Sequence, residues 1–180
     1  MLRPAPTRRG PRVALQVPQT RDRAEFLALV RGSRAFHRGW TTPPRTPAAF
    51  ARYRTACARP DYAGLLVRRH EDDALVGAIQ ISQIVRGLFQ SAYLGFWVGA
   101  PFARQGLMHE ALDLALDFAF RQLRLHRVEA NVQPTNGASL ALVQRLGFRR
   151  EGYSPRYLKI AGRWRDHERW ALLAEEWRRP

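Results

Sequence analysis

The sequence contains one cysteine, one lysine and no long apolar run. Cys57 alone cannot form an intramolecular disulfide, so a reducing compartment suits the chain. No stretch approaches the roughly 20 apolar residues of a membrane-spanning helix, and the N-terminal residues lack the apolar segment of a signal peptide. These absences predict a cytoplasmic protein in which residues 1–11 form a disordered basic tail.

Several motifs of common binding sites are missing too. There is no GxxxxGK(S/T) sequence, which excludes a P-loop nucleotide triphosphatase, and no GxGxxG sequence, which excludes the dinucleotide-binding fingerprint. The histidines show no metal-ligand spacing such as HExxH, so no metal is expected. These histidines are His37, His70, His109, His126 and His167.

Acidic charge is scarce relative to basic charge. The sequence has 30 lysines and arginines against 15 aspartates and glutamates, a formal net charge of +15, and Lys159 is the only lysine. A basic surface favours electrostatic contact with the ribosome, RNA or another acidic partner. The almost exclusive use of arginine is equally well explained by a genome-wide codon bias, so both interpretations stay open.

The order of apolar and turn residues predicts a mixed α/β fold in one domain over residues 12–178. No internal repeat or low-complexity linker divides the chain. We expect Asp22 and Glu25 to cap the first helix as a pair, and Thr46 with Pro47 to start the second. The expected elements, in order, are strand 13–17, a helix to about residue 34, helix 47–58, strands 62–69, 74–85 and 94–98, a helix to about residue 123, a strand around residues 128–131, a helix after residue 136, and extended segments 149–160 and 163–173.

The centre of this pattern is a loop between a strand and a helix. Residues 94–98 form a short apolar run rich in strand-forming residues. The helix that ends near Leu123 is apolar on most of its surface, which predicts that it is buried. The loop between them, residues 99–106, brings free backbone N–H groups to the helix start. Such a loop can bind an anion, with Arg104 as a cationic helper, or can serve only as a tight turn.

A second motif lies downstream. Asn136 is placed to cap a helix with apolar residues at helical spacing over residues 140–146, and Gly147 ends that helix in the usual left-handed conformation. Asn136 and Ser139 are explained either by helix capping alone or by a role in a site. The two roles are compatible for Asn136.

Together, the glycine-bearing loop and the sequence N-x-x-S-x-x-L-x-x-x-x-GF resemble the GNAT superfamily of N-acetyltransferases. Within it, the chain is similar to the ribosomal-protein-alanine N-acetyltransferase (RimJ) branch in the segments LGFWVG, RQGLMHEAL, LHRVEANVQPTN, LGFRREGY and YLKIAGRWRDH. The resemblance implies a three-layer α/β/α fold with a central mixed, mostly antiparallel sheet that is split by a cofactor cleft. It also implies acetyl-CoA as donor and an amine as acceptor.

The chain departs from the family's loop pattern at two positions. Ala103 stands where a polar residue is expected, and Met108 stands where a small one is expected. Because main-chain donors do not depend on side-chain identity, we expect the loop to bind the pyrophosphate mainly through its backbone N–H groups.

The resemblance implies site residues of three kinds. Those implied for cofactor binding are Trp97, Val98, Arg104, Gln105, Gly106, Leu107, Met108, Asn136 and Ser139. Those implied for acceptor binding are Phe36, His37, Trp40, Asn131 and Asp166. The catalytic candidates are Ser139 near the thiolate, Tyr157 as an acid and Glu129 as the best remaining carboxylate. A main-chain N–H near Trp97 or Val98 would meet the oxyanion.

No general base is secure, because Arg156 stands where related enzymes have a carboxylate before the Tyr-Leu pair. The sequence predicts an acetyl-CoA-dependent N-acetyltransferase that acts on a protein N-terminal α-amine, of a ribosomal protein. Two alternatives stay open: acetylation of a small-molecule amine, and binding of ribosomal RNA by a catalytically weak GNAT-fold module. The oligomeric state is open as well.

Overall fold

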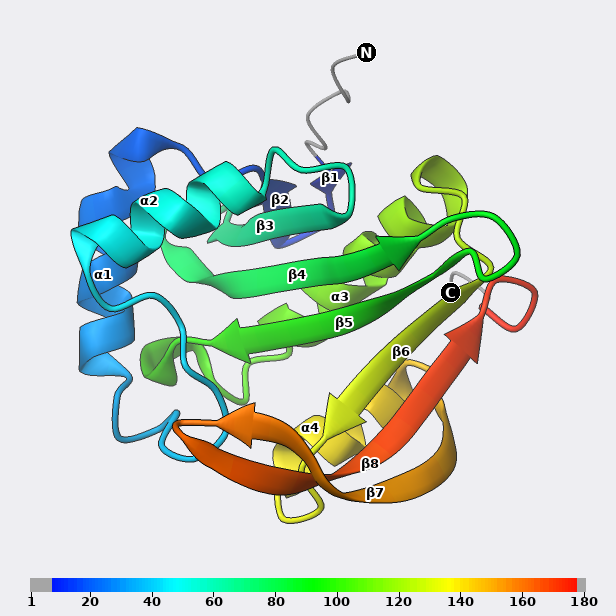
Figure 1. Cartoon of the computed structure of the whole chain (residues 1–180). Helices are drawn as coiled ribbons and strands as arrows, with labels where there is room; N and C mark the ends of the chain where they lie inside the picture. The colour runs from blue at the N-terminus through cyan, green and yellow to red at the C-terminus, as the bar shows by residue number, and fades with distance from the viewer. Residues whose placement is uncertain (1–7, 178–180) are drawn as a thin grey trace.

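The computed structural model describes residues 8–177. Within this part, eight strands form one sheet in the order β1-β2-β3-β4-β5-β6-β8-β7 (Figure 1). Neighbouring strands are antiparallel except for β5 and β6, which are parallel. The strands are β1 (Arg8–Arg9), β2 (Val13–Gln16), β3 (Tyr62–Arg69), β4 (Leu75–Val85), β5 (Ser91–Val98), β6 (Arg127–Val132), β7 (Arg149–Ile160) and β8 (Arg163–Leu173).

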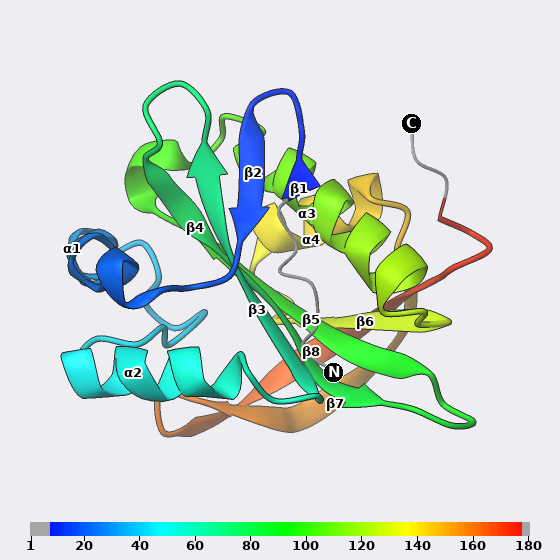
Figure 2. The same cartoon turned by 90° about the horizontal axis from the view of Figure 1, so that it is seen from above.

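Helices cover both faces of the sheet (Figure 2). α1 (Arg23–Gly32) and α2 (Pro47–Ala56) lie on one face, and α3 (Leu107–Asp117) and α4 (Gly137–Arg145) lie on the other. α3 continues as a π-helical turn over Phe118–Gln122. This arrangement confirms the predicted three layers and the mixed, mostly antiparallel sheet. None of the helices within residues 8–177 has the length and apolar character needed to cross a membrane.

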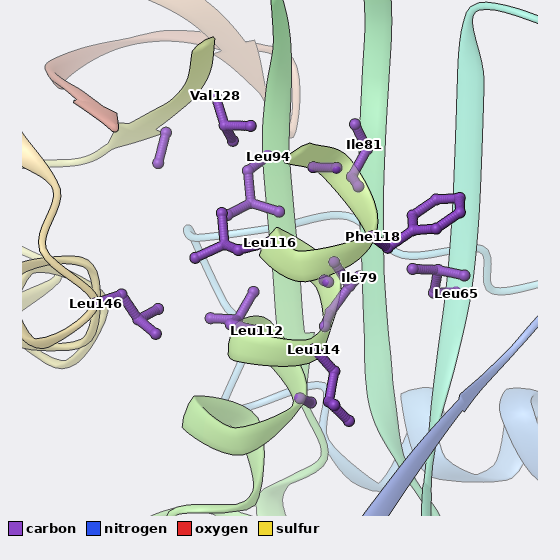
Figure 3. Close-up of a cluster of buried hydrophobic side chains, with 14 of the residues drawn as sticks. Leu65, Ile79, Ile81, Leu94, Leu112, Leu114, Leu116, Phe118, Val128 and Leu146 are labelled. Carbon is purple, nitrogen blue, oxygen red and sulfur yellow. The ribbon is translucent and has the colours of Figure 1, made fainter. Parts of the chain in front are cut away.

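The larger hydrophobic core lies between the sheet and α3 (Figure 3). Leu112 and Leu116 of α3 are fully buried, and they face the side chains of Ile79 and Leu94. Burial of one such side chain contributes about 1.5–3 kcal/mol. The core therefore fixes α3 against the sheet, and with it the loop that precedes the helix. A smaller core around Phe26 fills the space under α1 and α2.

The first strand corrects the prediction of a disordered tail over residues 1–11. Residues 1–7 lie outside the described residues, but Arg8 pairs with Leu15 of β2. The guanidinium of Arg8 also forms an ion pair with Asp117 at the end of α3, whose side chain is 1% exposed. A buried carboxylate needs a partner because its removal from water is unfavourable. Arg8 supplies that partner and holds β1 to the fold.

The first helix also begins differently from the prediction. Asp22 makes no capping hydrogen bond to α1, and Asp22 and Glu25 instead accept hydrogen bonds from Arg68 of β3. The contact between Asp22 and Arg68 is 2.7 Å long, and both residues are buried. Glu25 also accepts the N–H of Leu75 at 2.7 Å. The two carboxylates therefore tie α1 to the β3–β4 hairpin.

Replacement of Arg68 by methionine tests this ion network. Arg68→Met leaves Asp22 buried without a counter-charge, and loss of one partner from a buried pair costs about 3–5 kcal/mol. We expect the free energy of unfolding, measured by urea denaturation, to fall by that amount. Arg69→Met is the matched control, because Arg69 pairs with Asp72 at the surface, where ion pairs contribute little. Equal losses in the two variants would contradict the role assigned to Arg68.

Candidate active site

The site is built where β5 and β6 part. The strands are parallel neighbours over only three register pairs, Ser91 with Arg127, Ala92 with Val128 and Tyr93 with Glu129. Beyond these pairs, β5 continues to Val98 beside β4, and β6 continues to Val132 beside β8, so the two strands diverge (Figure 1). Their facing edges carry backbone N–H and C=O groups that no neighbouring strand satisfies. Such groups need other partners.

Val98 turns its main chain toward this gap. The N–H of Gly99 donates to Val76 of β4 at 2.7 Å, and the main-chain groups of successive strand residues point to opposite sides. The main-chain N–H and C=O groups of Trp97 therefore point toward β4, and those of Val98 point away from it. His37 fits this assignment, since its Nε2 lies 2.8 Å from the carbonyl oxygen of Val98. Of the two predicted oxyanion donors, the geometry favours the N–H of Val98.

A cavity of about 940 Å³ occupies the gap. Its walls come from β5, β6, the loop before α3, the start of α4, residues 36–41 and the β7–β8 hairpin. Small-molecule sites have volumes of roughly 300–1,000 Å³, so this cavity lies at the large end of that range. It joins elements from several parts of the chain at the split in the sheet, and it can accept an extended ligand.

The loop before α3 contains two left-handed residues. Arg104 and Gly106 have φ angles of 62° and 76°. Gly106 is the N-cap residue of α3, and no side chain caps the helix there. The first N–H groups of α3 are therefore available to an anion. Arg12 braces the loop, because its Nη1 donates to the carbonyl oxygen of Gln105 at 3.0 Å.

Most residues implied for cofactor binding line the cavity, namely Trp97, Val98, Arg104, Gly106, Met108, Asn136 and Ser139. The side chains of Gln105 and Leu107 do not. Gln105 donates from its side-chain amide to the carbonyl oxygen of Pro101 at 2.8 Å, and Leu107 is buried in the larger core. These two residues can contribute only main-chain groups, which is the mode of binding that the sequence predicts for this loop.

Asn136 caps α4 as predicted. Its Oδ1 accepts the N–H of Ser139 at 3.2 Å, and both residues line the cavity. Since the cap uses the amide oxygen, the NH₂ group of Asn136 and the hydroxyl group of Ser139 are the polar groups left for a ligand. Capping and ligand binding are therefore compatible for both residues.

The two predicted carboxylates, Glu129 and Asp166, do not line the cavity, contrary to prediction. Glu129 forms an ion pair with Arg127 at 2.8 Å. Asp166 accepts hydrogen bonds from the hydroxyl group of Tyr153 and from the N–H of Arg156. Both carboxylates are satisfied by neighbouring residues instead. Within residues 8–177, the cavity lining contains no aspartate or glutamate at all.

The remaining predicted residues do line the cavity, and they are Phe36, His37, Trp40, Asn131 and Tyr157. Sequence analysis gave no site role to a further set of lining residues, which includes Gln80, Gln83, Tyr93, Gln133 and Arg145. His167, in the matched segment WRDH, was expected either to bind the acceptor or to brace the last strands, and it lines the cavity. A hydrogen bond to Tyr157 and burial raise the pKa of Tyr93 to about 12. Gln133 could have been found, because it follows Asn131 by two residues and so continues the same face of an extended chain.

Two buried histidines, His37 and His167, favour the neutral form, because burial lowers the pKa of each from its usual value. A carbonyl oxygen can only accept a hydrogen bond, so the ring nitrogen beside it carries the proton. That nitrogen is Nε2 in His37, against Val98, and Nδ1 in His167, which lies 3.0 Å from the oxygen of Arg165.

Two buried acceptors in the cavity lining lack a partner. Nδ1 of His37 and Oδ1 of Asn131 are both buried, and neither has a hydrogen bond from any residue within 8–177. An unsatisfied buried acceptor is destabilising by about 1–3 kcal/mol.

Comparison with known proteins agrees with this geometry. A family model described as an acetyltransferase (GNAT) domain matches residues 12–149. The alanine N-acetyltransferase of ribosomal protein uS5 from Escherichia coli (strain K12) is 41% identical over 107 residues, which cover 59% of this chain and 55% of that protein. The protein named probable N-acetyltransferase YjcK from Bacillus subtilis (strain 168) is 40% identical over 102 residues, covering 57% and 56%. The matched part thus spans about half the length of these curated relatives.

Solved structures agree as well. RimJ from Mycobacterium smegmatis, in complex with CoA-disulfide, superposes with a TM-score of 0.84 at 30% sequence identity, covering 91% of this chain and 83% of that one. The resemblance stated from the sequence is thereby confirmed. Since the family model covers more than half of the chain, this protein belongs to the GNAT acetyltransferase family.

Proposed function

We propose that this protein is an N-acetyltransferase that uses acetyl-CoA and acts on the α-amine at the N-terminus of a ribosomal protein. The observation that carries the proposal is the parting of β5 and β6 beside the left-handed loop residues Arg104 and Gly106. Support for the donor comes from the CoA-disulfide complex of M. smegmatis RimJ. Support for the acceptor comes from the uS5-alanine N-acetyltransferase of E. coli.

The donor half of the cavity fits an extended molecule with phosphates at one end. The first N–H groups of α3, with the charge of Arg104, would hold the pyrophosphate. The open edge of β5 would hold the arm that follows it, and the N–H of Val98 would donate to the thioester oxygen, where negative charge develops. Acetyl-CoA supplies the acyl group as a thioester. Asn136 would hold the arm from the side of α4.

Two hydroxyl groups in the cavity can protonate the departing sulfur. Ser139 lies at the start of α4, and Tyr157 lies on β7; both line the cavity. Tyr93 supports Tyr157 through the hydrogen bond between their hydroxyl groups. We therefore keep Ser139 and Tyr157 as catalytic candidates, each in the role of a proton donor.

The acceptor half suits a peptide N-terminus better than a polycationic small amine. Within the described residues, no carboxylate lines the cavity, whereas Arg104 and Arg145 do, so a polyamine would meet repulsion without compensation. A peptide brings one amine followed by amide groups. Side-chain amides such as that of Gln83 line the cavity and can pair with this backbone.

We assign the activity to a single domain over residues 12–178. One continuous sheet runs through the described part of the chain, which supports this assignment. Electrostatic contact with the ribosome or its RNA is a further prediction, supported by the net charge of +15.

Substitutions in the loop test the proposed donor site. Proline cannot adopt the φ angle of 76° found at Gly106 and has no N–H, so Gly106→Pro should abolish acetyl-CoA binding in calorimetric titration. Gly106→Val should weaken it, because a branched side chain is strained at positive φ. Arg104→Ala removes only an exposed charge and should weaken binding by about 1 kcal/mol or less.

The matched control for backbone strain is Gly162→Val. Gly162 has a φ angle of 81°, has open space around its Cα, and lies in the β7–β8 turn outside the cavity lining. This variant should bind acetyl-CoA like the parent. If Gly106→Pro binds normally while its circular dichroism shows a folded protein, the loop is not the pyrophosphate site.

A comparison of cells with and without the gene tests the acceptor. We expect at least one ribosomal protein to lose its N-terminal acetyl group, detected as a mass decrease of the intact protein. Purified enzyme should then acetylate a peptide with that N-terminal sequence and leave spermidine unmodified. An unchanged ribosomal proteome together with efficient acetylation of spermidine would favour the small-molecule alternative. RNA binding that falls steeply with salt, without any acetyl transfer, would favour the RNA-binding alternative.

A further inference from the structure

One step of the proposed acetyl transfer, the removal of a proton from the acceptor amine, has no residue assigned to it so far. An α-amine with a pKa near 8 is largely protonated at pH 7, and only the neutral amine can attack a carbonyl carbon. A group in the cavity that accepts this proton would make the whole of the bound amine reactive. Arg156, and not a carboxylate, precedes the Tyr157-Leu158 pair in this chain. Within the described residues, no carboxylate lines the cavity.

His167 has the position and the tautomer that a proton acceptor in this cavity needs. It stands on β8, is 3% exposed and lines the cavity. Its Nδ1 lies 3.0 Å from the carbonyl oxygen of Arg165, so Nδ1 carries the proton when the ring is neutral. Nε2 then holds a lone pair, and no residue within 8–177 donates a hydrogen bond to it. The backbone thus fixes both the orientation of the ring and the nitrogen that can accept a proton.

The other titratable groups of the cavity are less suited to this step. Nε2 of His37 is committed to Val98, and Nδ1 of His37 is fully buried. His109 lies on the first turn of α3, at the end of the cavity that would hold the phosphates. Tyr93 stays protonated, because the hydrogen bond to Tyr157 and burial raise its pKa to about 12.

We propose that His167 is the catalytic base, which takes a proton on Nε2 from the ammonium group of the acceptor. This inference rests on the proposed function. One N–H bond of the ammonium breaks and one N–H bond forms on the imidazole, which leaves a neutral amine. When the amine nitrogen bonds to the acyl carbon, it loses a second proton while the departing sulfur gains one. The imidazolium then returns its proton to solvent, so each transfer releases one proton overall.

The surroundings of His167 keep the ring neutral at pH 7. Burial lowers the pKa of His167 from its usual value, and the hydrogen bond to the carbonyl of Arg165 and the charge of Asp166 oppose this shift without reversing it. The ring of Tyr157 packs beside it with the centroids 6.3 Å apart. The other titratable or charged groups are Arg165 and Glu168 on the same strand and, elsewhere in the cavity lining, Tyr93, His37, His109, Arg104 and Arg145. Activity should therefore fall as the pH drops through the lowered pKa, because protonation removes the lone pair.

The test compares His167→Gln with the parent protein. Glutamine is polar and cannot accept the proton, so kcat toward an α-amine peptide should fall about 100-fold or more at pH 7. The deficit should shrink toward pH 9, where the acceptor amine is already neutral in solution. Acetyl-CoA binding by calorimetry and the KM for the donor should stay at parental values. His126→Gln is the control, because the His126 side chain is 53% exposed and pairs with Glu175, outside the cavity lining.

A second readout needs no turnover. Nitrogen-15 NMR of the free protein should show the Nδ1–H tautomer of His167 near pH 7 and titration below pH 6.5. An Nε2–H tautomer overturns the inference, and so does an equal loss of kcat at pH 7 and pH 9, which indicates a structural role. A parent protein that transfers acetyl to no α-amine overturns the proposed function itself. An active parent with a fully active His167→Gln variant overturns only the role of His167.

Discussion

The structure depends on a competition between strand pairings at the centre of the sheet. β5 forms a long antiparallel ladder with β4, and β6 forms one with β8, while the two strands share only a short parallel contact that ends at Tyr93 and Glu129. Each ladder holds its own strand, so β5 and β6 cannot stay together along their full length. The sheet remains one sheet but opens over residues 94–98. The opening exposes main-chain groups that a folded protein normally satisfies internally, and these groups can bind a ligand.

Most of the carboxylates discussed above pair with arginines that come from neighbouring strands and helices. Carboxylates near the site are held by arginines: Arg127 pairs with Glu129 and also with Glu151, and this pairing lowers the pKa of Glu151. Farther away, Asp22 and Asp117 are buried against arginines that come from other elements. Because acidic residues are few in this chain and many of them brace strands and helices, acid–base chemistry in the cavity falls to neutral side chains. Histidine and tyrosine are the residues that can supply it.

Local signals in the sequence were sufficient to predict the elements that frame the site. Asn136 caps α4, Gly147 adopts a left-handed conformation with a φ angle of 86°, and Thr46 accepts the N–H of Ala49 at the start of α2. Each of these features depends on residues within a few positions of one another. Pro155 is another local signal, because proline cannot donate to a strand ladder and is confined to edges and bulges. It lies in β7, an edge strand whose register shifts between residues 154 and 158.

The features that the sequence did not reveal depend on contacts between distant segments. Asp22 and Glu25 have the spacing of a capping pair, but Arg68, far along the chain, offers both carboxylates a buried cation, and that tertiary pairing replaces the local one. Glu129 alternates correctly with Asn131 along β6, yet alternation does not show that Arg127 covers the carboxylate. Periodicity identifies which residues share a face of a strand or helix. It does not identify which of those side chains will pair with a neighbouring side chain.

The contact between His37 and Val98 joins the two halves of the cavity. His37 belongs to the irregular segment that bears Phe36 and Trp40, and large aromatic side chains in such a segment can either anchor it or contact a ligand. Nε2 of His37 donates to the last carbonyl of β5, so the residue anchors its segment, while its other nitrogen stays buried without a partner in the lining of the cavity. The imidazole of His37 therefore anchors the segment and also forms part of the cavity wall. Since the Val98 peptide lies at the open edge proposed to hold the donor, a single hydrogen bond joins that edge to the segment that bears Phe36 and Trp40.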